Sequence, residues 1–213
     1  FCAKRSGGDS CIGVAVSDSP TGPFVAMDEP LITPETVSEN LGFSSGQTID
    51  PSIFTDDDGT SYIVWGNGYG AIAQLGDDMV SLVEGTFKRY SGLTDIRESL
   101  TIFKRNGIYH FLWSCDDTGS ENYHVNYGYA TDLYGTVTYV GTILSKDSSS
   151  GILGTGHQSV YYDEETDTAI IAYHRFVTPK GTYLSDYGVH RETCLDYLAF
   201  DEDGLIEVVS PSA

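Results

Sequence analysis

The stretch RESLTIFKRNGIYHFLWS, residues 97–114, is typical of two antiparallel strands joined by a tight turn. Asn106 and Gly107 form the dipeptide that a two-residue hairpin turn favours, because both positions of that turn require a positive φ. The apolar, β-branched and aromatic residues on either side indicate strands that are largely buried. Glu98 is the exception, since its carboxylate is either solvated at a strand edge or held at the strand's start for chemistry.

The plan of this hairpin recurs along the chain: a polar residue, a strand, a polar turn, and a second strand rich in aromatic residues. Trp65 lies 15 residues after Asp50, and Trp113 lies 15 residues after Glu98. The other copies are DPSIFTDDDGTSYIVWG (50–66), HQSVYYDEETDTAIIAYHR (157–175) and, more loosely, ETCLDYLAFDEDGLIEVV (192–209). Such self-similarity predicts a repeat architecture.

A second element also recurs, with a strand, a turn of the form S/T-D-x-x-x-G, and another strand. It is found at IGVAVSDSPTGPFVAMDEPLI (12–32) and VNYGYATDLYGTVTYVGTIL (125–144). Repeats of about 40 to 50 residues with four strands each are typical of propeller blades. We therefore predict an all-β, five-bladed β-propeller in which residues 1–213 form a single domain, a fragment with most of the first blade missing. A β-sandwich is the alternative that the strand pattern leaves open.

Asp50, Glu98 and His157 stand at the starts of three repeated hairpins. The innermost strands of a propeller line its central channel, so we expect these three side chains to converge on one pocket. Taken singly, each residue also has an ordinary interpretation as a turn aspartate, a solvated strand end, or a hydrogen-bonded histidine. A converging set of this kind suits glycoside hydrolysis, in which an acid protonates the leaving oxygen and a carboxylate activates water.

Two further expectations follow from this chemistry. A neighbouring negative group is expected to raise the pKa of the acid and so keep the acid protonated. Aromatic side chains offer flat apolar faces on which a sugar can stack, so we expect Trp65 and Trp113 to bind substrate. Arg191 is notable in so acidic a chain, either as a residue that binds hydroxyl or carboxylate groups or as one half of a surface ion pair.

The charge balance of the chain limits the classes of molecule that it can bind. Acidic residues number 31 against 11 basic residues, which gives a net charge of −20. Such a surface repels phosphate and anionic lipid, so we predict a neutral carbohydrate partner, and neither nucleic acid nor a membrane. The four cysteines are too scattered for a zinc site, and Cys2 and Cys11 form either a disulfide across a turn or remain reduced.

As an ordered set, these segments resemble glycoside hydrolase family 43, the five-bladed propellers that include arabinofuranosidases, xylosidases, arabinanases and galactanases. The resemblance covers nearly the whole chain. It rests on IGVAVSDSPTGPF, IDPSIFTDDDGTSYIVWG, RESLTIFKRNGIYHFLWS, GYATDLYGTVTYVGTIL, TGHQSV, AYHRF and HRETCLDYLAFDEDGLI. In the family the catalytic glutamate is usually followed by Gly or Ala and then by Pro, whereas Ser99 and Leu100 stand here.

The resemblance implies an inverting glycosidase that acts on arabinofuranosyl, xylosyl or galactosyl linkages of plant polysaccharides, outside the cell or at its surface. Glu98 matches the general acid, and Asp50 matches the aspartate that tunes its pKa and orients substrate. His157 matches a channel histidine that contacts substrate and lies, through water, beside a structural calcium ion in many members. Arg191 matches a substrate-contacting arginine. No cofactor is implied as a requirement.

The family's general base is an aspartate on the inner strand of the first blade, which this numbering places upstream of residue 1. We therefore expect the fragment alone to lack the base. The principal alternative function is a non-catalytic carbohydrate-binding propeller that keeps the pocket. A sialidase-like propeller is a weaker alternative, because TDDDGTSY (55–62) is a single turn of that type and sialic acid requires an arginine cluster.

Overall fold

Antiparallel strands make up almost all of the regular structure in the computed structural model, which describes residues 1–45, 47–177 and 190–212. The described residues contain one helix, α1 (Pro34–Leu41). The strands are β1 (Cys2–Lys4), β2 (Ser10–Ile12), β3 (Ala15–Val16), β4 (Val25–Ala26), β5 (Ser52–Thr55), β6 (Ser61–Trp65), β7 (Ala71–Gln74), β8 (Lys88–Arg89), β9 (Ile96–Arg105), β10 (Ile108–Cys115), β11 (His124–Ala130), β12 (Thr138–Leu144), β13 (Gly156–Asp163), β14 (Thr168–Phe176) and β15 (Arg191–Leu198). The all-β prediction is confirmed.

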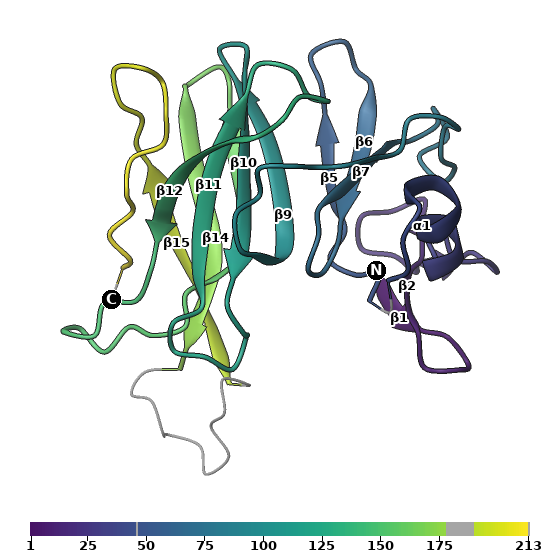
Figure 1. Ribbon diagram of the computed structural model, residues 1–213, viewed down its shortest axis with the longest axis horizontal. Helices are drawn as coiled ribbons and strands as arrows, with labels where there is room; N and C mark the ends of the chain where they lie inside the picture. Colours follow the sequence, from purple (N-terminus) through teal and green to yellow (C-terminus); the bar gives the residue numbers. More distant parts are fainter. Residues whose placement is uncertain (46, 178–189, 213) are drawn as a thin grey trace.

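The strands form five separate sheets, in each of which spatial neighbours are also consecutive in the chain. The sheets are β1–β2, β3–β4, β5–β8, β9–β12 and β13–β15. In Figure 1 the N-terminal strands and α1 lie on the right, β5–β7 lie beside them, and β9–β12 follow on the left, where β14 and β15 overlap them in this view. Small up-and-down sheets side by side are the arrangement of propeller blades rather than of a two-sheet sandwich. The number of blades stays a prediction.

The repeated segments mostly form the hairpins that the sequence predicted. Residues 97–114 form β9 and β10, joined by Asn106 and Gly107 with φ angles of 51° and 78°. Residues 50–66 and 157–175 form β5–β6 and β13–β14, and the second repeated element forms β3–β4 and β11–β12. The prediction that residues 192–209 form a fourth copy of the hairpin is wrong. The first strand of this segment is β15, which pairs with β14 as the third strand of the preceding sheet.

Three clusters of buried side chains lie where the sheets face one another. The first joins β5–β7 to β9–β10 and includes Phe54, Val64, Leu100 and Phe111. The second joins the β9–β12 sheet to the β13–β15 sheet, and the third packs α1 and the N-terminal strands against β6 and β7. Each middle sheet is therefore apolar on both faces, and this packing holds the starts of β5, β9 and β13 close together.

Helix α1 was not anticipated from the sequence. Thr33 caps its N-terminus, with its hydroxyl accepting from the Thr36 backbone, and Pro34 begins the first turn. The helix ends at Gly42, which has a left-handed φ of 74°. Val37 is its fully buried residue and joins the third core cluster. The helix thereby fixes where Phe43 emerges beside the β5–β8 sheet.

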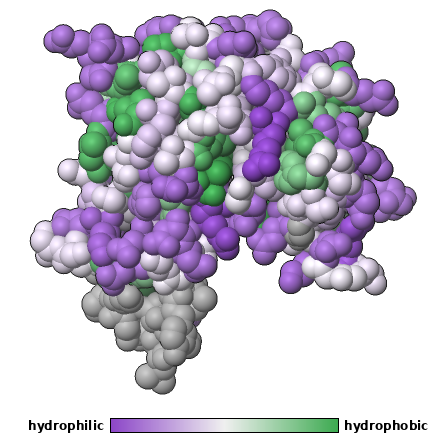
Figure 2. Space-filling view, in the orientation of Figure 1, coloured by the Kyte–Doolittle hydropathy of each residue, from purple (hydrophilic) through white to green (hydrophobic). Residues whose placement is uncertain are grey.

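The four cysteines are free, and Cys2 is exposed whereas Cys11 is buried. Cys2 pairs with Ile12 and Cys11 with Ala3, so the two thiols lie at successive positions on opposite faces of the β1–β2 hairpin. The reduced alternative is the one that the structure shows. On the face in Figure 2, hydrophilic and intermediate residues surround smaller apolar patches. No helix in the described ranges has the length and apolar character needed to cross a bilayer.

Candidate active site

Asp50, Glu98 and His157 converge from three different sheets, as their places in the repeats predicted. The His157 ring contacts both carboxylates, with Nδ1 3.6 Å from Glu98 Oε1 and Nε2 4.0 Å from Asp50 Oδ1. Glu98 is buried at 5% exposure, whereas the His157 side chain is 43% exposed. The cluster is thus buried at the glutamate and open to solvent at the histidine.

Each of the three inner strands carries a β-bulge beside its site residue. Between the two residue pairs that flank each bulge, three steps along the inner strand correspond to two steps along its partner. The inner strand therefore has one extra residue. The flanking pairs are Ile49–Gly66 and Ser52–Val64, Glu98–Ser114 and Thr101–Leu112, and Gly156–His174 and Ser159–Ala172. Bulges bend the strand and redirect side chains, which is why they are common next to active sites.

The bulges correct the equivalence that the sequence suggested. Asp50, Ser99 and His157 are the first residues of the three bulges, whereas Glu98 lies one position earlier. The equal 15-residue spacing to the tryptophans arises because the β9–β10 hairpin is one residue shorter, since Thr101 and Leu112 are 11 residues apart whereas Ser52 and Val64 are 12 apart. The three side chains still meet, although Glu98 enters the cluster from a different position of its bulge.

The same three bulge residues have left-handed backbones. The φ angles are 59° at Asp50, 59° at Ser99 and 52° at His157. Such values are uncommon for residues with a side chain and store strain that the surrounding structure must maintain. Glycine adopts this conformation without cost, which gives a physical reason for the glycine that often follows the catalytic glutamate in the family that the sequence resembles.

Two neutral donors hold the Glu98 carboxylate. The Tyr123 hydroxyl donates to Oε1 at 2.7 Å, and the Asn67 side-chain amide donates to Oε2 at 2.9 Å. Tyr123 is fully buried, and its ring stacks on that of His174 with centroids 5.4 Å apart. Sequence reasoning missed Tyr123, Asn67 and His174, although Asn67 follows Trp65-Gly66 directly and His174 lies within the AYHRF segment.

The electrostatics of the cluster differ from the expectation. Burial alone would raise the pKa of Glu98, but His157 and the Tyr123 hydroxyl hold that pKa below its ordinary value. The expected rise of the acid's pKa is therefore not found, because donors to the carboxylate outweigh its desolvation. Burial, with repulsion from Glu98, raises the pKa of Asp50, and the contact with Glu98 raises the pKa of His157.

Arg191 lies at the edge of this site and the tryptophans lie outside it. Arg191 is exposed at the start of β15, within electrostatic range of His157 and His174. Trp65 and Trp113 are 0% exposed in the core clusters, so neither ring presents a face to a sugar. The prediction that these two rings stack on a sugar is therefore wrong, because both lie on strand faces that pack against neighbouring sheets.

The donor set allows a cation beside the cluster. Asp50, Glu98 and His157 each offer one ligand atom within 4.8 Å of the others. The buried Oδ2 of Asp50 has no hydrogen-bond partner among the described residues, so one carboxylate oxygen is available to an ion or to water. Calcium prefers oxygen ligands, and His157 fits such an ion only through an intervening water.

Up-and-down sheets whose inner strands bring two carboxylates and a histidine together define this chain as a propeller-type protein with an acidic site. The profile "Glycosyl hydrolases family 43" matches residues 1–206. The chain belongs to this family.

Individual relatives are similar over most of this chain. It is 30% identical over 199 residues to the "Beta-D-galactofuranosidase xynD" of Aspergillus niger, covering 92% of this chain and 54% of the relative. It is 27% identical over 233 residues to the "Arabinoxylan arabinofuranohydrolase" of Bacillus subtilis, covering 99% of this chain and 43% of the relative. The chain thus spans about half the length of the curated relatives it matches.

Solved structures agree with the fold. One is a thermostable family-43 glycoside hydrolase, with a TM-score of 0.77, 26% identity, and coverage of 99% of this chain and 70% of that one. Another is an α-L-arabinofuranosidase from Clostridium thermocellum, with a TM-score of 0.74, 26% identity, and coverage of 99% and 68%.

Proposed function

We propose that this chain belongs to an inverting glycoside hydrolase that cleaves arabinofuranosyl, xylosyl or galactosyl linkages of plant polysaccharides or their oligosaccharides. The observation that carries the proposal is the buried Glu98 carboxyl, held by Tyr123 and Asn67 beside Asp50 and His157. Family membership and the printed names of the relatives, which include xylosidases, arabinosidases and a galactofuranosidase, support the substrate range.

In this mechanism Glu98 donates its proton to the leaving oxygen as the glycosidic bond breaks. The Glu98 carboxylate that results is stabilised by the Tyr123 hydroxyl, the Asn67 amide and the His157 ring. These contacts make Glu98 a stronger acid than an ordinary glutamic acid side chain, which favours proton transfer but keeps a smaller fraction protonated at neutral pH. Asp50 orients the sugar and repels negative charge on Glu98, and Arg191 contacts substrate hydroxyls.

Asp50 is not proposed as the general base. Inverting enzymes separate the acid and base carboxyl groups by about 6.5–9.5 Å, so that a water molecule fits between them and the sugar. One carboxylate oxygen of Asp50 lies within 4.8 Å of one of Glu98, which is too close for that arrangement. We propose that the base is an additional aspartate on a further inner strand of the propeller, upstream of residue 1.

An activity screen tests the proposal. The chain, and a longer form of the protein that extends upstream by about 60 residues, a little more than one repeat, are incubated with nitrophenyl glycosides and with arabinan, xylan and galactan oligosaccharides. Glu98→Gln is expected to lower the rate on natural linkages by about 10²–10⁴-fold. Glu202→Gln removes the same charge at an exposed turn and is the matched control, expected to leave the rate unchanged. Release of no sugar by either form would overturn the proposal.

The second candidate is a non-catalytic carbohydrate-binding propeller. It is favoured by the same short Asp50–Glu98 separation, since the described residues bring no third carboxylate to this cluster that could serve as the base. Titration calorimetry with the same oligosaccharides distinguishes the two. Binding without any product on long incubation supports this candidate, and Glu98 would then be a ligand contact.

We also propose that residues 1–213 belong to one five-bladed propeller domain with most of its first blade missing. The β13–β15 sheet supports further blades, because Tyr161, Leu195 and Tyr197 expose 64%, 63% and 75% of their surfaces on it. Such an apolar sheet face is suited to packing against another blade. Limited proteolysis of the longer protein should leave these residues protected, and cleavage at β15 would contradict the proposal.

No cofactor is required by this mechanism, and a calcium ion is proposed only as a structural addition, held near His157 through water and near the free oxygen of Asp50. A calcium-dependent rise in Tm that Asp50→Asn abolishes would support it, and an unchanged Tm would refute it. An extracellular or cell-surface location is proposed because polymeric plant glycans do not enter cells. Fractionation of the source organism checks this location.

A further inference from the structure

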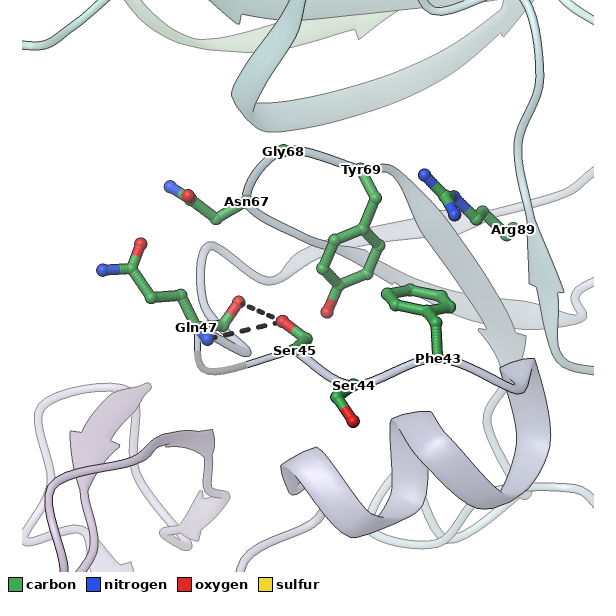
Figure 3. Close-up of a pocket in the computed structure, with 8 residues that line it drawn as sticks. All are labelled: Phe43, Ser44, Ser45, Gln47, Asn67, Gly68, Tyr69 and Arg89. Atoms are coloured by element: carbon green, nitrogen blue, oxygen red, sulfur yellow. Dashed lines mark hydrogen bonds between the residues drawn. The ribbon is translucent and has the colours of Figure 1, made fainter.

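A pocket of about 380 Å³ lies beside the catalytic cluster, between the segment after α1, the turn after β6, and β8. Figure 3 shows its lining side chains, which come from all three elements. They are Phe43, Ser44, Ser45, Gln47, Asn67, Gly68, Tyr69 and Arg89. A volume of this order is enough for one sugar residue.

Asn67 joins this pocket to the proposed chemistry. Its side chain lines the pocket and also donates to Glu98 Oε2 at 2.9 Å. The turn that presents it depends on Gly66, which has a φ of 138° and where a Cβ atom would lie 2.1 Å from the Tyr69 carbonyl oxygen. A ligand here would therefore be one amide side chain away from the acid, which is where a neighbouring sugar of the substrate would lie.

Tyr69 supplies an unpartnered polar group in the pocket. Its side chain is 4% exposed, and its hydroxyl oxygen is buried with no hydrogen-bond partner among the described residues. In Figure 3 this hydroxyl points towards Ser44 and Ser45 rather than away from the pocket. A buried hydroxyl without a partner is costly, so its presence favours a ligand that completes the hydrogen bond.

The charge of the pocket is opposite to that of the protein. Arg89 is the single charged residue of the lining, in a chain whose net charge is −20. Its guanidinium lies over the Phe43 ring at 4.7 Å, and no ion pair involves it within the described ranges. Stacking fixes the plane of the guanidinium and leaves its N–H groups free to bind a carboxylate side-on.

We propose that this pocket binds a uronic acid, a sugar that carries a carboxylate, next to the linkage that is cleaved. Arg89 binds the carboxylate, while the Tyr69 hydroxyl and the amides of Gln47 and Asn67 bind sugar hydroxyls. The position relative to the scissile bond rests on the proposed function, whereas the preference for a uronic acid rests on the pocket alone. The partner predicted from net charge was a neutral carbohydrate, and this pocket adds one acidic residue to it.

Matched sugars test the preference. Glucuronic acid and glucose differ at C6 alone, as do galacturonic acid and galactose, so the Kd ratio within each pair isolates the carboxylate. Binding is measured by titration with NMR detection at low salt and at high salt. The protein is expected to bind one uronic acid at least about tenfold more tightly than its neutral partner, with the preference shrinking at high salt.

Three variants complete the experiment. Arg89→Gln is expected to abolish the preference for the uronic acid. Tyr69→Phe is expected to weaken the binding of both sugars of a pair to a similar extent. Arg5→Gln removes an equal charge from the turn between β1 and β2 and is expected to keep the preference. Equal binding of both sugars, or a preference that survives Arg89→Gln, would overturn the inference.

Hydrolysis is measured separately, so that the two proposals fail independently. Cleavage of neutral oligosaccharides without any preference for uronic acids would leave the proposed function standing and remove this inference. An Arg89-dependent preference without cleavage would support the pocket and count against the function. Cleavage of uronic acid-substituted oligosaccharides faster than of unsubstituted ones, lost in Arg89→Gln, supports both.

Discussion

Replacing Tyr123 by Phe tests whether Glu98 is held as a carboxylate in the folded protein. The substitution keeps the fully buried ring and its stacking on His174 but removes the hydroxyl that donates to Glu98 Oε1 at 2.7 Å. A hydrogen bond to a charged group contributes about 1.5–3 kcal/mol to stability. The free energy of unfolding near neutral pH is therefore expected to fall by about this amount.

The loss of stability in Tyr123→Phe should depend on pH, because the hydroxyl stabilises the ionised form of Glu98. Removing the hydroxyl is therefore also expected to raise the pKa of Glu98 in the folded protein. A carboxyl whose pKa is lowered on folding adds stability above its unfolded pKa, and that stability is lost as pH falls through the folded value. The difference between wild type and Tyr123→Phe should therefore shrink in acid.

Urea denaturation followed by the fluorescence of the two buried tryptophans measures these free energies at about pH 7 and about pH 4. Tyr90→Phe is the matched control, since the buried Tyr90 hydroxyl donates to the neutral Leu133 carbonyl at 3.0 Å. It should cost about 0.5–1.5 kcal/mol at both pH values. A loss in Tyr123→Phe as small and as independent of pH as in the control would refute the reasoning.

The remaining predictions concern the pH profile, the core and the turn before the pocket. The value of kcat/KM should fall as pH rises because Glu98 loses its proton, and the midpoint of this fall should lie below about pH 4.5. The reason is that His157 and Tyr123 lower the pKa of Glu98 from 4.5 by more than burial raises it. A midpoint near neutral pH would contradict this prediction. Burial, helped by the charge of Arg105, lowers the pKa of His110 from 6.5 to about 4. Stability from His110 is therefore present above pH 6.5 and lost as pH falls towards 4, a loss of about 2 kcal/mol at pH 5. His110→Phe should flatten that pH dependence in urea denaturation, and an unchanged slope would count against it. Gly66→Ala should lower the free energy of unfolding by more than about 2 kcal/mol, because its φ of 138° is strained for alanine and the Tyr69 carbonyl leaves no room for Cβ. Thermal melting checks this prediction. Gly85→Ala is the control for backbone strain alone, since a Cβ there meets no atom within 4 Å.

Local signals predicted the hairpins well. The Asn106-Gly107 turn and the alternation around it require contributions only from neighbouring residues, so the sequence contains them directly. The repeats also predicted that Asp50, Glu98 and His157 converge, because residues at the starts of inner strands meet in any such architecture. The fourth repeat failed, since a lone β-rich segment at 192–209 does not reveal which strand it pairs with.

The sequence by itself determined the all-β class, the boundaries of the main hairpins and the three residues that meet between the sheets, because turn chemistry and the two-residue period of strands act over short distances. Only the tertiary structure decided that a bulge shifts Glu98 by one position, that Tyr123 and Asn67 hold its carboxylate, and that Trp65 and Trp113 are buried. The pocket beside Arg89 belongs to the same group. These features depend on which face of one sheet packs against the next, and that choice is made by contacts between residues far apart in the chain.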